Sequence, residues 1–320
     1  MAKKNKEQIL KITMLGGRGV GKTSLLTAMY EQFDSTIGET NLQLIPDPKS
    51  SARLAQRLGQ LKAILDDFEA TGGLGGTEKP EPVNFELGKR GAATDVNIVF
   101  QDFPGGYIDG NNEDFIKQTM EESAAVLIAI DTPPLMESEG QWNDLINRPK
   151  QICDIFKRNY KDLKKNRLVL LVPVRCEKYL QNEQEAIVLR ETLKEKYNEL
   201  LKFFRSDNMI DKVACVITPV QTVGTVIFSR IQIKEGNPYF YFRKISHDAK
   251  YIPQDSDQPL RYVLSFLLKD YYQRKGFWAR FIRWMELENH LQEAAIKCSQ
   301  KCKNTGGFAI LQGEDKLYIK

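Results

Sequence analysis

A glycine-rich stretch close to the N-terminus restricts the fold of this chain more than any other feature. Residues 16–23 read GGRGVGKT and match G-x-x-x-x-G-K-[ST] at every fixed position. The apolar run 9–15 precedes the glycines, and the helix-like run 23–33 follows them. Glycines at a strand-to-helix turn let backbone N–H groups face inward, where the helix N-terminus adds partial positive charge. The stretch therefore predicts a phosphate-binding loop rather than an ordinary glycine turn.

This loop, a P-loop, predicts binding of a nucleoside triphosphate together with Mg²⁺. We expect Lys22 to reach the terminal phosphates and the Thr23 hydroxyl to bind the metal ion. The predicted nucleotide-binding residues of the loop and the following turn are Gly17, Arg18, Gly19, Val20, Gly21, Lys22, Thr23 and Ser24.

A second motif, Asp102-Phe103-Pro104-Gly105, follows the strand-like run 96–100. At this place an aspartate can hold Mg²⁺ through water, and the glycine N–H can detect a γ-phosphate. Asp, Pro and Gly also favour ordinary turns, but a P-loop in the same chain favours the functional interpretation. The predicted catalytic residues are Lys22, Arg18, Asp102 and Gly105, and the predicted metal ligands are Thr23, Thr40 and Asp102.

Strand-like and helix-like runs alternate along the chain, as in a parallel sheet with helical crossovers. The sequence therefore predicts the α/β class, a P-loop NTPase fold with a mostly parallel sheet sandwiched by helices. The predicted strands are 9–15, 83–87, 96–100, 124–130, 168–174 and 213–217, with a hairpin turn near 88–91. The predicted helices are 23–33, 142–160, 183–204 and 257–274.

Two stretches interrupt this alternation. Residues 46–80 predict a helical insertion, because apolar side chains from Leu54 to Phe68 have helical spacing and a loop rich in Gly and Pro begins at residue 72. Residues 222–244 predict an extra hairpin, because two strand-like runs flank Glu-Gly-Asn-Pro. The chain then divides into a P-loop domain over 1–275 and a C-terminal helical extension over 276–320.

Composition limits the compartment and the partners. The sequence has no run of about 18 apolar residues, so we expect no membrane span. Its five cysteines follow no regular framework, which indicates reduced thiols and a cytoplasmic protein. The formal net charge is only +4, and residues 269–303 carry eight basic and four acidic side chains. This modest excess disfavours nucleic acid as a partner.

The C-terminal extension carries apolar side chains at helical spacing from Phe277 to Cys302. The favoured interpretation is a helix that docks on the P-loop domain. A partner-binding helix or a membrane-surface helix is the alternative. Cys298 and Cys302 lie near His290, but a closed zinc site needs four ligands, so we expect free thiols.

The motifs resemble those of the Ras-like, translation-factor-related GTPase class. The resemblance extends over residues 9–272 and includes GKTSLL at 21–26, D-x-x-G at 102–105 and the strand ending at Asp131. It implies GTP or GDP and Mg²⁺ as ligands. Within the class, the chain is most similar to the bacterial double-GTPase-type and related conflict-system GTPases, which share a helical insertion and a basic-x-Glu in place of N-K-x-D.

The run Val174-Arg175-Cys176-Glu177 lies where the family has N-K-x-D. The resemblance implies that Arg175 packs along the guanine base and that Glu177 accepts hydrogen bonds from base N–H groups, as a carboxylate can. Val174 replaces the Asn of the motif, which weakens the expected guanine preference.

Two further departures concern hydrolysis. Gly106 lies where Ras-like members place a water-orienting Gln, and Arg18 lies inside the P-loop. These residues imply slow intrinsic hydrolysis, or hydrolysis completed by a partner or by Arg18, because an arginine at the transferring phosphate accelerates the reaction. Arg18 as a solvated loop side chain is the alternative. The resemblance also implies that a threonine of the first switch segment binds Mg²⁺. The spacing from Thr23 favours Thr40 for this role, whereas the local sequence favours Thr36.

The favoured function is a Mg²⁺-dependent, slowly hydrolysing GTP switch that controls a partner protein, in a bacterial defence or conflict system by resemblance. An effector or activator protein is the expected partner, and the sequence leaves homo- and hetero-oligomers open. The first alternative is an ATPase of another P-loop branch. It is supported by the missing N-K-x-D and by Asp131, the second aspartate that ends a predicted strand. No Glu adjoins Asp131 to activate water, which counts against it. The second alternative is a scaffold that binds the nucleotide without hydrolysing it, because Gly106 replaces the water-orienting Gln.

Overall fold

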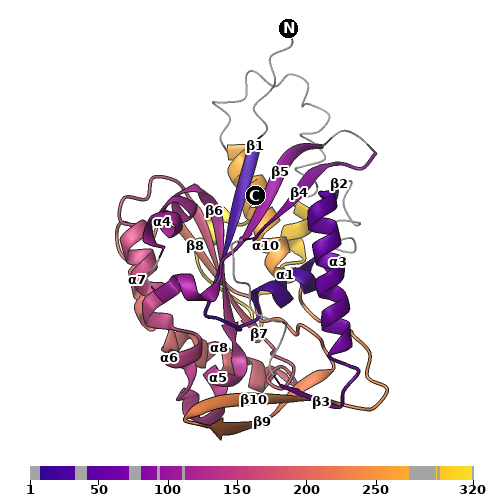
Figure 1. The fold of residues 1–320 in the computed structure, drawn as a ribbon. Helices are drawn as coiled ribbons and strands as arrows, with labels where there is room; N and C mark the ends of the chain where they lie inside the picture. Colours follow the sequence, from indigo (N-terminus) through magenta and orange to yellow (C-terminus); the bar gives the residue numbers. More distant parts are fainter. Residues whose placement is uncertain are drawn as a thin grey trace.

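The computed structural model describes residues 8–32, 42–71, 81–91, 94–109, 112–273, 293 and 296–318. Five parallel strands form its centre: β1 (Gln8–Leu15), β5 (Thr94–Asp102), β6 (Ser123–Asp131), β7 (Arg167–Val174) and β8 (Val213–Ile217). Three antiparallel strands extend the edges: β2 (Leu42–Pro46), β4 (Glu81–Lys89) and β11 (Ala309–Gln312). The strand order is β11-β8-β7-β6-β1-β5-β4-β2 (Figure 1). The prediction of an α/β fold with a mostly parallel sheet is confirmed.

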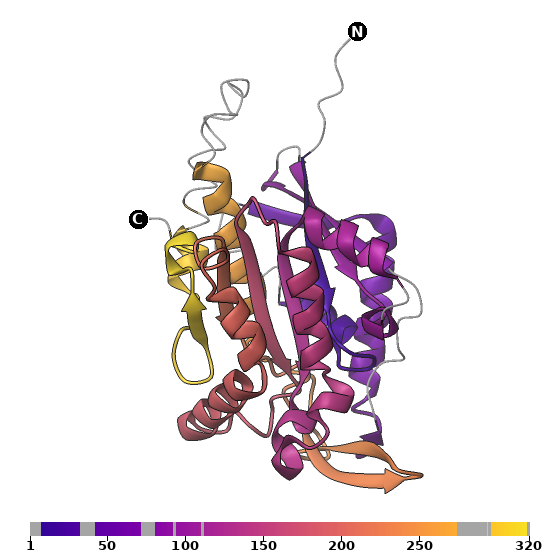
Figure 2. The same ribbon diagram turned by 90° about the vertical axis from the view of Figure 1, so that its left-hand side faces the viewer.

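Helices cover both faces of this sheet, as Figures 1 and 2 show. The reason is that the central strands are apolar on both sides, and all eight residues of β7 are buried. One face of the sheet packs on α1 (Lys22–Glu31), α3 (Pro48–Ala63) and α10 (Gln258–Gln273), and the other on α4 (Glu113–Glu122), α7 (Pro149–Asn159), α8 (Glu183–Lys196) and α9 (Asn198–Phe204).

Within the described residues, no helix is both long enough and apolar enough to cross a bilayer.

The helical insertion and the extra hairpin form one second sheet. Its strands are β3 (Glu69–Thr71), β10 (Asn237–Lys244) and β9 (Val226–Lys234), in that order and all antiparallel. In both views this sheet lies beyond the carboxyl ends of the parallel strands (Figures 1 and 2). Glu235 and Gly236 turn between β9 and β10 with φ of 50° and 77°, as a tight hairpin requires.

The insertion helix α3 begins with a strong cap and ends earlier than the sequence pattern indicates. The Asp47 carboxylate accepts a hydrogen bond from the Ser50 N–H at 2.6 Å, and Pro48 occupies the first helical turn. The predicted apolar spacing continues to Phe68, but the helix stops at Ala63 and the chain turns into β3. Pairing with β10 therefore replaces the expected last helical turn.

Two predicted helices are each divided in the structure. The range 142–160 contains α6 (Asn143–Ile146) and α7, separated by Arg148 with φ of 55°. Arg148 precedes Pro149, and a residue before proline disfavours the helical region. The break also lets the Asn147 side chain bond the backbone of Asp131, at 2.7 Å and 2.9 Å. The range 183–204 is divided at Tyr197 into α8 and α9.

The C-terminal segment contributes a strand as well as helical structure. Within the described residues of 276–320, the range 296–300 is helical, and β11 pairs antiparallel with β8. The side chains of Cys298 and Leu317 lie in the same apolar cluster as α10. The range 274–292, with most of the predicted apolar stripe and His290, lies outside the described residues.

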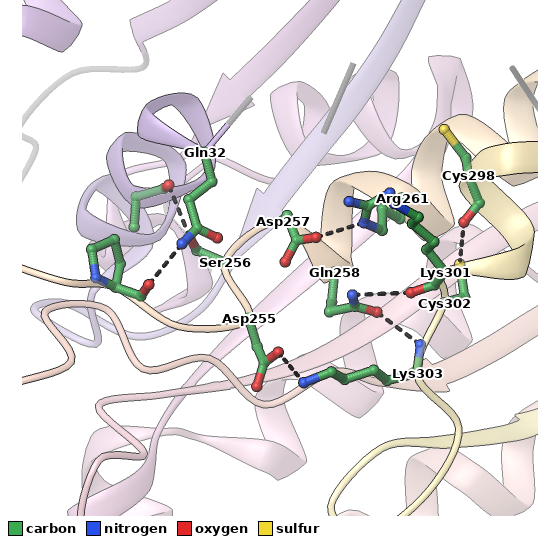
Figure 3. Close-up of polar contacts among 12 residues, drawn as sticks. Gln32, Asp255, Ser256, Asp257, Gln258, Arg261, Cys298, Lys301, Cys302 and Lys303 are labelled. Atoms are coloured by element: carbon green, nitrogen blue, oxygen red, sulfur yellow. Dashed lines mark hydrogen bonds and ion pairs between the residues drawn. The ribbon is translucent and has the colours of Figure 1, made fainter. Parts of the chain in front are cut away.

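A polar network joins this segment to the start of α10 (Figure 3). The Gln258 amide donates to the carbonyl of Lys301 at 3.2 Å and accepts from the N–H of Lys303 at 2.8 Å. The Lys303 ammonium also pairs with Asp255 at 2.6 Å. The Cys302 thiol donates to the Cys298 carbonyl at 3.4 Å, and neither cysteine forms a disulfide with a described residue. The described residues 301–303 of this segment are therefore bonded to the start of α10 and to the residues just before it.

Candidate functional site

The P-loop connects the end of β1 at Leu15 to the start of α1 at Lys22. Gly19 and Gly21 have φ of 76° and 103°, a region that residues with side chains rarely adopt. Between them, the Val20 side chain is fully buried in the apolar cluster under α1. Arg18 and Gly19 are exposed at the tip, whereas Ser24 is buried in the first turn of the helix. The predicted strand, loop and helix are all present.

Lys22 lies under the loop with its ammonium held by backbone carbonyls. Its Nζ donates to the carbonyls of Gly16 and Gly17, each at 2.9 Å, and the residue is 6% exposed. Burial lowers the pKa of Lys22 from its ordinary value, and the Asp102 carboxylate acts in the opposite direction. Among the described residues, this buried ammonium has only neutral oxygens as hydrogen-bond acceptors, an environment that favours an additional anion such as a phosphate chain.

The two predicted metal ligands that the structure describes lie side by side. The Thr23 hydroxyl donates to Oδ2 of Asp102 at 2.7 Å. The parallel register places Met14 opposite Asp102, so the end of β5 adjoins the P-loop. A hydroxyl and a carboxylate are hard oxygen donors of the kind that Mg²⁺ prefers. The third predicted ligand, Thr40, and its rival Thr36 lie outside the described residues.

The Asp102–Gly105 turn packs directly on the P-loop. A Cβ at Gly105 would lie 2.2 Å from the backbone nitrogen of Arg18, so only glycine fits there. Gly106 has open space around it and is exposed. The γ-phosphate sensor predicted at Gly105 is therefore in contact with the loop that would hold the phosphates.

Arg175 joins three elements around the P-loop. Its guanidinium donates to Oδ2 of Asp131 at 2.7 Å and to the carbonyl of Gly19 at 3.2 Å. The same group lies 5.2 Å from the centre of the Phe242 ring on β10. Arg175 itself has φ of 60°, which directs the chain sharply away from β7. A residue predicted to contact the base thus contacts the P-loop and the second sheet.

The Asp131–Arg175 ion pair was not predicted from the sequence. Asp131 ends β6 and Arg175 follows the adjacent β7, so the neighbouring strand ends could have indicated the pair. Burial raises the pKa of Asp131 to about 6, although Arg175 acts to lower it. Oδ1 of Asp131 is buried and accepts no hydrogen bond from a described residue, which adds to the cost of charging this group.

Glu177 is turned toward the backbone of the chain itself. Its Oε1 accepts from the N–H of Val223 at 2.9 Å and from the N–H of Gly224 at 3.1 Å. The residue is 2% exposed. Burial raises the pKa of Glu177, and the two backbone N–H groups oppose that shift. The sequence contained no signal for this contact, because the partner groups belong to the backbone.

The structure therefore gathers most of the predicted site at the carboxyl ends of β1, β5 and β7. Lys22, Thr23, Asp102 and Gly105 surround the P-loop, and Arg175 reaches it through Gly19. Glu177 lies two residues beyond Arg175 and faces the loop before β9.

No protein-family model matches the chain, and no curated protein matches it. Among solved structures, the GTP-bound GTPase-like domain of S. cerevisiae Ski7 is similar, with 16% identity and a TM-score of 0.42. The match covers 68% of this chain and 43% of that chain, so it spans less than half of the Ski7 chain. The SRb-GTP/SRX signal recognition particle receptor complex from Chaetomium thermophilum has 15% identity, a TM-score of 0.40 and coverages of 68% and 92%.

The GDP- and phosphate-bound form of the Ski7 domain has 16% identity, a TM-score of 0.39 and coverages of 68% and 43%. The fold assignment for this chain rests on its own strand order and on the strand, loop and helix around Lys22.

Proposed function

We propose that this chain binds a guanine nucleoside triphosphate with Mg²⁺, hydrolyses it slowly and acts as a switch that controls a partner protein. The observation that carries the proposal is the arrangement at the P-loop. The buried Lys22 ammonium lies beneath the loop, and the Thr23 hydroxyl meets Asp102 at 2.7 Å beside it. A place in a bacterial defence system is supported by the sequence resemblance alone.

In this proposal, separate residues bind the phosphates, bind the metal ion and assist hydrolysis. Backbone N–H groups of the loop and the α1 N-terminus hold phosphate oxygens, and Lys22 adds positive charge to them. Thr23 and Asp102 would hold Mg²⁺, which when bound neutralises phosphate charge. The exposed Arg18 at the loop tip is free to approach the transferring phosphate. Gly106 carries no side chain to orient water, which accounts for slow hydrolysis in this proposal.

The switch itself would lie in the Asp102–Gly105 turn. Gly105 contacts the backbone at Arg18, so a change at the loop tip reaches this turn directly. The turn continues into the short 3₁₀ helix η1 (Gly105–Asp109), where Ile108 is buried and Gly106 is exposed. An effector or activator protein that contacts the exposed Gly106, next to this buried turn, would detect its position.

The test is binding of non-hydrolysable GTP and ATP analogues, with Mg²⁺, to the wild type, Lys22→Ala and Glu177→Ala. We expect tight GTP-analogue binding that Lys22→Ala lowers at least about a hundredfold, which corresponds to roughly 2.7 kcal/mol. The matched control is Lys202→Ala, an exposed lysine on α9, which should leave affinity unchanged. If the wild type binds neither analogue, the proposal is wrong.

An ATP-binding protein is the second candidate, and one observation favours it. Oε1 of Glu177 is already used by the N–H groups of Val223 and Gly224, so this carboxylate is not simply open to a guanine base. Equal or better binding of the ATP analogue, unaffected by Glu177→Ala, would establish this candidate. A scaffold without hydrolysis is motivated by Gly106, and single-turnover hydrolysis of GTP above background would exclude it.

A further inference from the structure

The contact between Glu177 and the loop before β9 holds two parts of the site together. A carboxylate oxygen has two lone pairs, and Oε1 of Glu177 already accepts two N–H groups, at 2.9 Å and 3.1 Å. This oxygen is therefore saturated. A ligand that pairs with both oxygens of Glu177 has to displace Val223 or Gly224 from Oε1.

The displaced loop could not move alone, because it is paired with the segment 250–254. The Ile252 N–H donates to the Val223 carbonyl at 3.0 Å, and Gln221 and Gln254 exchange two backbone hydrogen bonds of 3.0 Å. Gly224 has φ of 83°, and a Cβ there would lie 1.7 Å from the Ile252 carbonyl oxygen. The two segments are in such close contact that a shift of one moves the other.

This paired segment leads to two further elements. Toward α1, the Gln32 amide donates to the Pro253 carbonyl at 2.7 Å, and the Ser256 hydroxyl donates to the Ala28 carbonyl at 3.0 Å (Figure 3). Toward the second sheet, Val226 begins β9 two residues after Gly224. The contact at Glu177 thus connects the P-loop helix with the hairpin.

We propose that Glu177 is a latch, which exchanges the N–H groups of Val223 and Gly224 for those of a guanine base and so releases the β9–β10 hairpin. The proposal rests on the proposed function, because it assigns a consequence to the base of the bound nucleotide. Guanine offers two adjacent N–H donors on one edge, which match the two oxygens of a carboxylate. Adenine has no such pair, so it leaves the latch closed even when its phosphates occupy the same P-loop.

The experiment is backbone hydrogen exchange of the intact chain, followed in peptides that contain Val223 and Gly224. The probes are the imido analogues of GTP, inosine triphosphate and ATP, each saturating and with Mg²⁺. We expect the GTP analogue to accelerate exchange at these two positions at least about tenfold, because their acceptor is lost. The inosine analogue, with one donor fewer, should give a smaller change, and the ATP analogue none.

Two variants separate a latch from a merely structural anchor. Glu177→Gln keeps an acceptor oxygen for the N–H groups of Val223 and Gly224 but cannot accept both guanine donors, so exchange at these positions should stay slow in every sample. Glu195→Gln, an exposed glutamate on α8, is the matched control and should behave like the wild type. If the GTP analogue binds in a Lys22-dependent manner and exchange at Val223 and Gly224 stays unchanged, the latch is refuted and the proposed function stands. Absence of any Lys22-dependent binding refutes both.

Discussion

Thr23, at the start of α1, donates a hydrogen bond of 2.7 Å to Asp102, which lies 79 residues later at the end of β5. The contact exists because β1 and β5 are adjacent parallel strands whose carboxyl ends meet at one edge of the sheet. It unites two short motifs that the sequence presents separately.

Replacement of Asp102 by Asn should weaken Mg²⁺-dependent nucleotide binding. The neutral amide keeps the shape of the side chain but loses the charge that attracts a divalent cation. We expect affinity for a triphosphate analogue to fall at least about tenfold with Mg²⁺, or about 1.4 kcal/mol, and to change little in chelator. Asp114→Asn, an exposed aspartate on α4, is the control for the measurement. An equal loss with and without Mg²⁺ would remove Asp102 from the metal site.

Gly105 and Gly106 form a matched pair of neighbouring glycines. An alanine at Gly105 would place its Cβ 2.2 Å from the Arg18 nitrogen, whereas an alanine at Gly106 meets no atom within 4 Å. Gly105→Ala should therefore lower the free energy of unfolding by roughly 1–3 kcal/mol, as overpacking does, and also weaken nucleotide binding. Chemical denaturation and analogue binding of both variants measure this. Similar behaviour of the two would show that the turn does not press on the P-loop.

The pH dependence of stability should carry a contribution from Asp131. Its folded-state pKa of about 6 lies above that of an unfolded aspartate, which is about 3.9. The folded state therefore binds more protons between these values, so the contribution to stability is full below about pH 4 and is lost as the pH rises through about 6. The loss is of the order of 3 kcal/mol, from about two pKa units.

Asp131→Asn should remove this part of the slope. The measurement is the free energy of unfolding from pH 4 to pH 7, and the change of slope is compared rather than the absolute value, because the variant also loses its ion pair with Arg175. Burial also raises the pKa of Glu177, and this residue is present in both proteins. Asp207→Asn, an exposed control, should keep the wild-type slope. A parallel pair of curves for Asp131→Asn would contradict the assignment.

Leu317 tests whether the C-terminal segment belongs to the main core. Its side chain is 0% exposed and lies in the apolar cluster with α10. Leu317→Ala should lower the free energy of unfolding by about 2–5 kcal/mol in one cooperative transition. Leu145→Ala, at a position that is 50% exposed, should change it by less than about 0.5 kcal/mol. A separate early transition in the Leu317 variant would indicate an independent C-terminal unit.

The parts of the fold that were predictable have long, self-contained signals. Buried strands such as β6 and β7 are continuous apolar runs, and the P-loop is defined by residues next to one another in the chain. The hairpin of β9 and β10 was predictable because its turn residues lie between two strand-like runs.

The parts that were not predictable depend on partners distant in the sequence. The strands β3 and β11 have three and four residues, too few for a periodic pattern, and each forms only because another strand lies beside it. Arg175 and Glu177 were predicted to face a base, but their observed partners are a carboxylate and backbone groups. Such pairings are set by the packed structure, so a short sequence motif does not reveal them.

The second sheet combines strands from two separate insertions. Glu69 of β3 lies opposite Arg243 of β10, and the two residues form part of one continuous ladder. If either insertion were lost during evolution, the other would keep a strand with a bare edge, a site prone to aggregation. The two insertions therefore form one structural unit encoded in two places. A relative that lacks the first should lack the second, and an engineer who shortens this chain has to remove both.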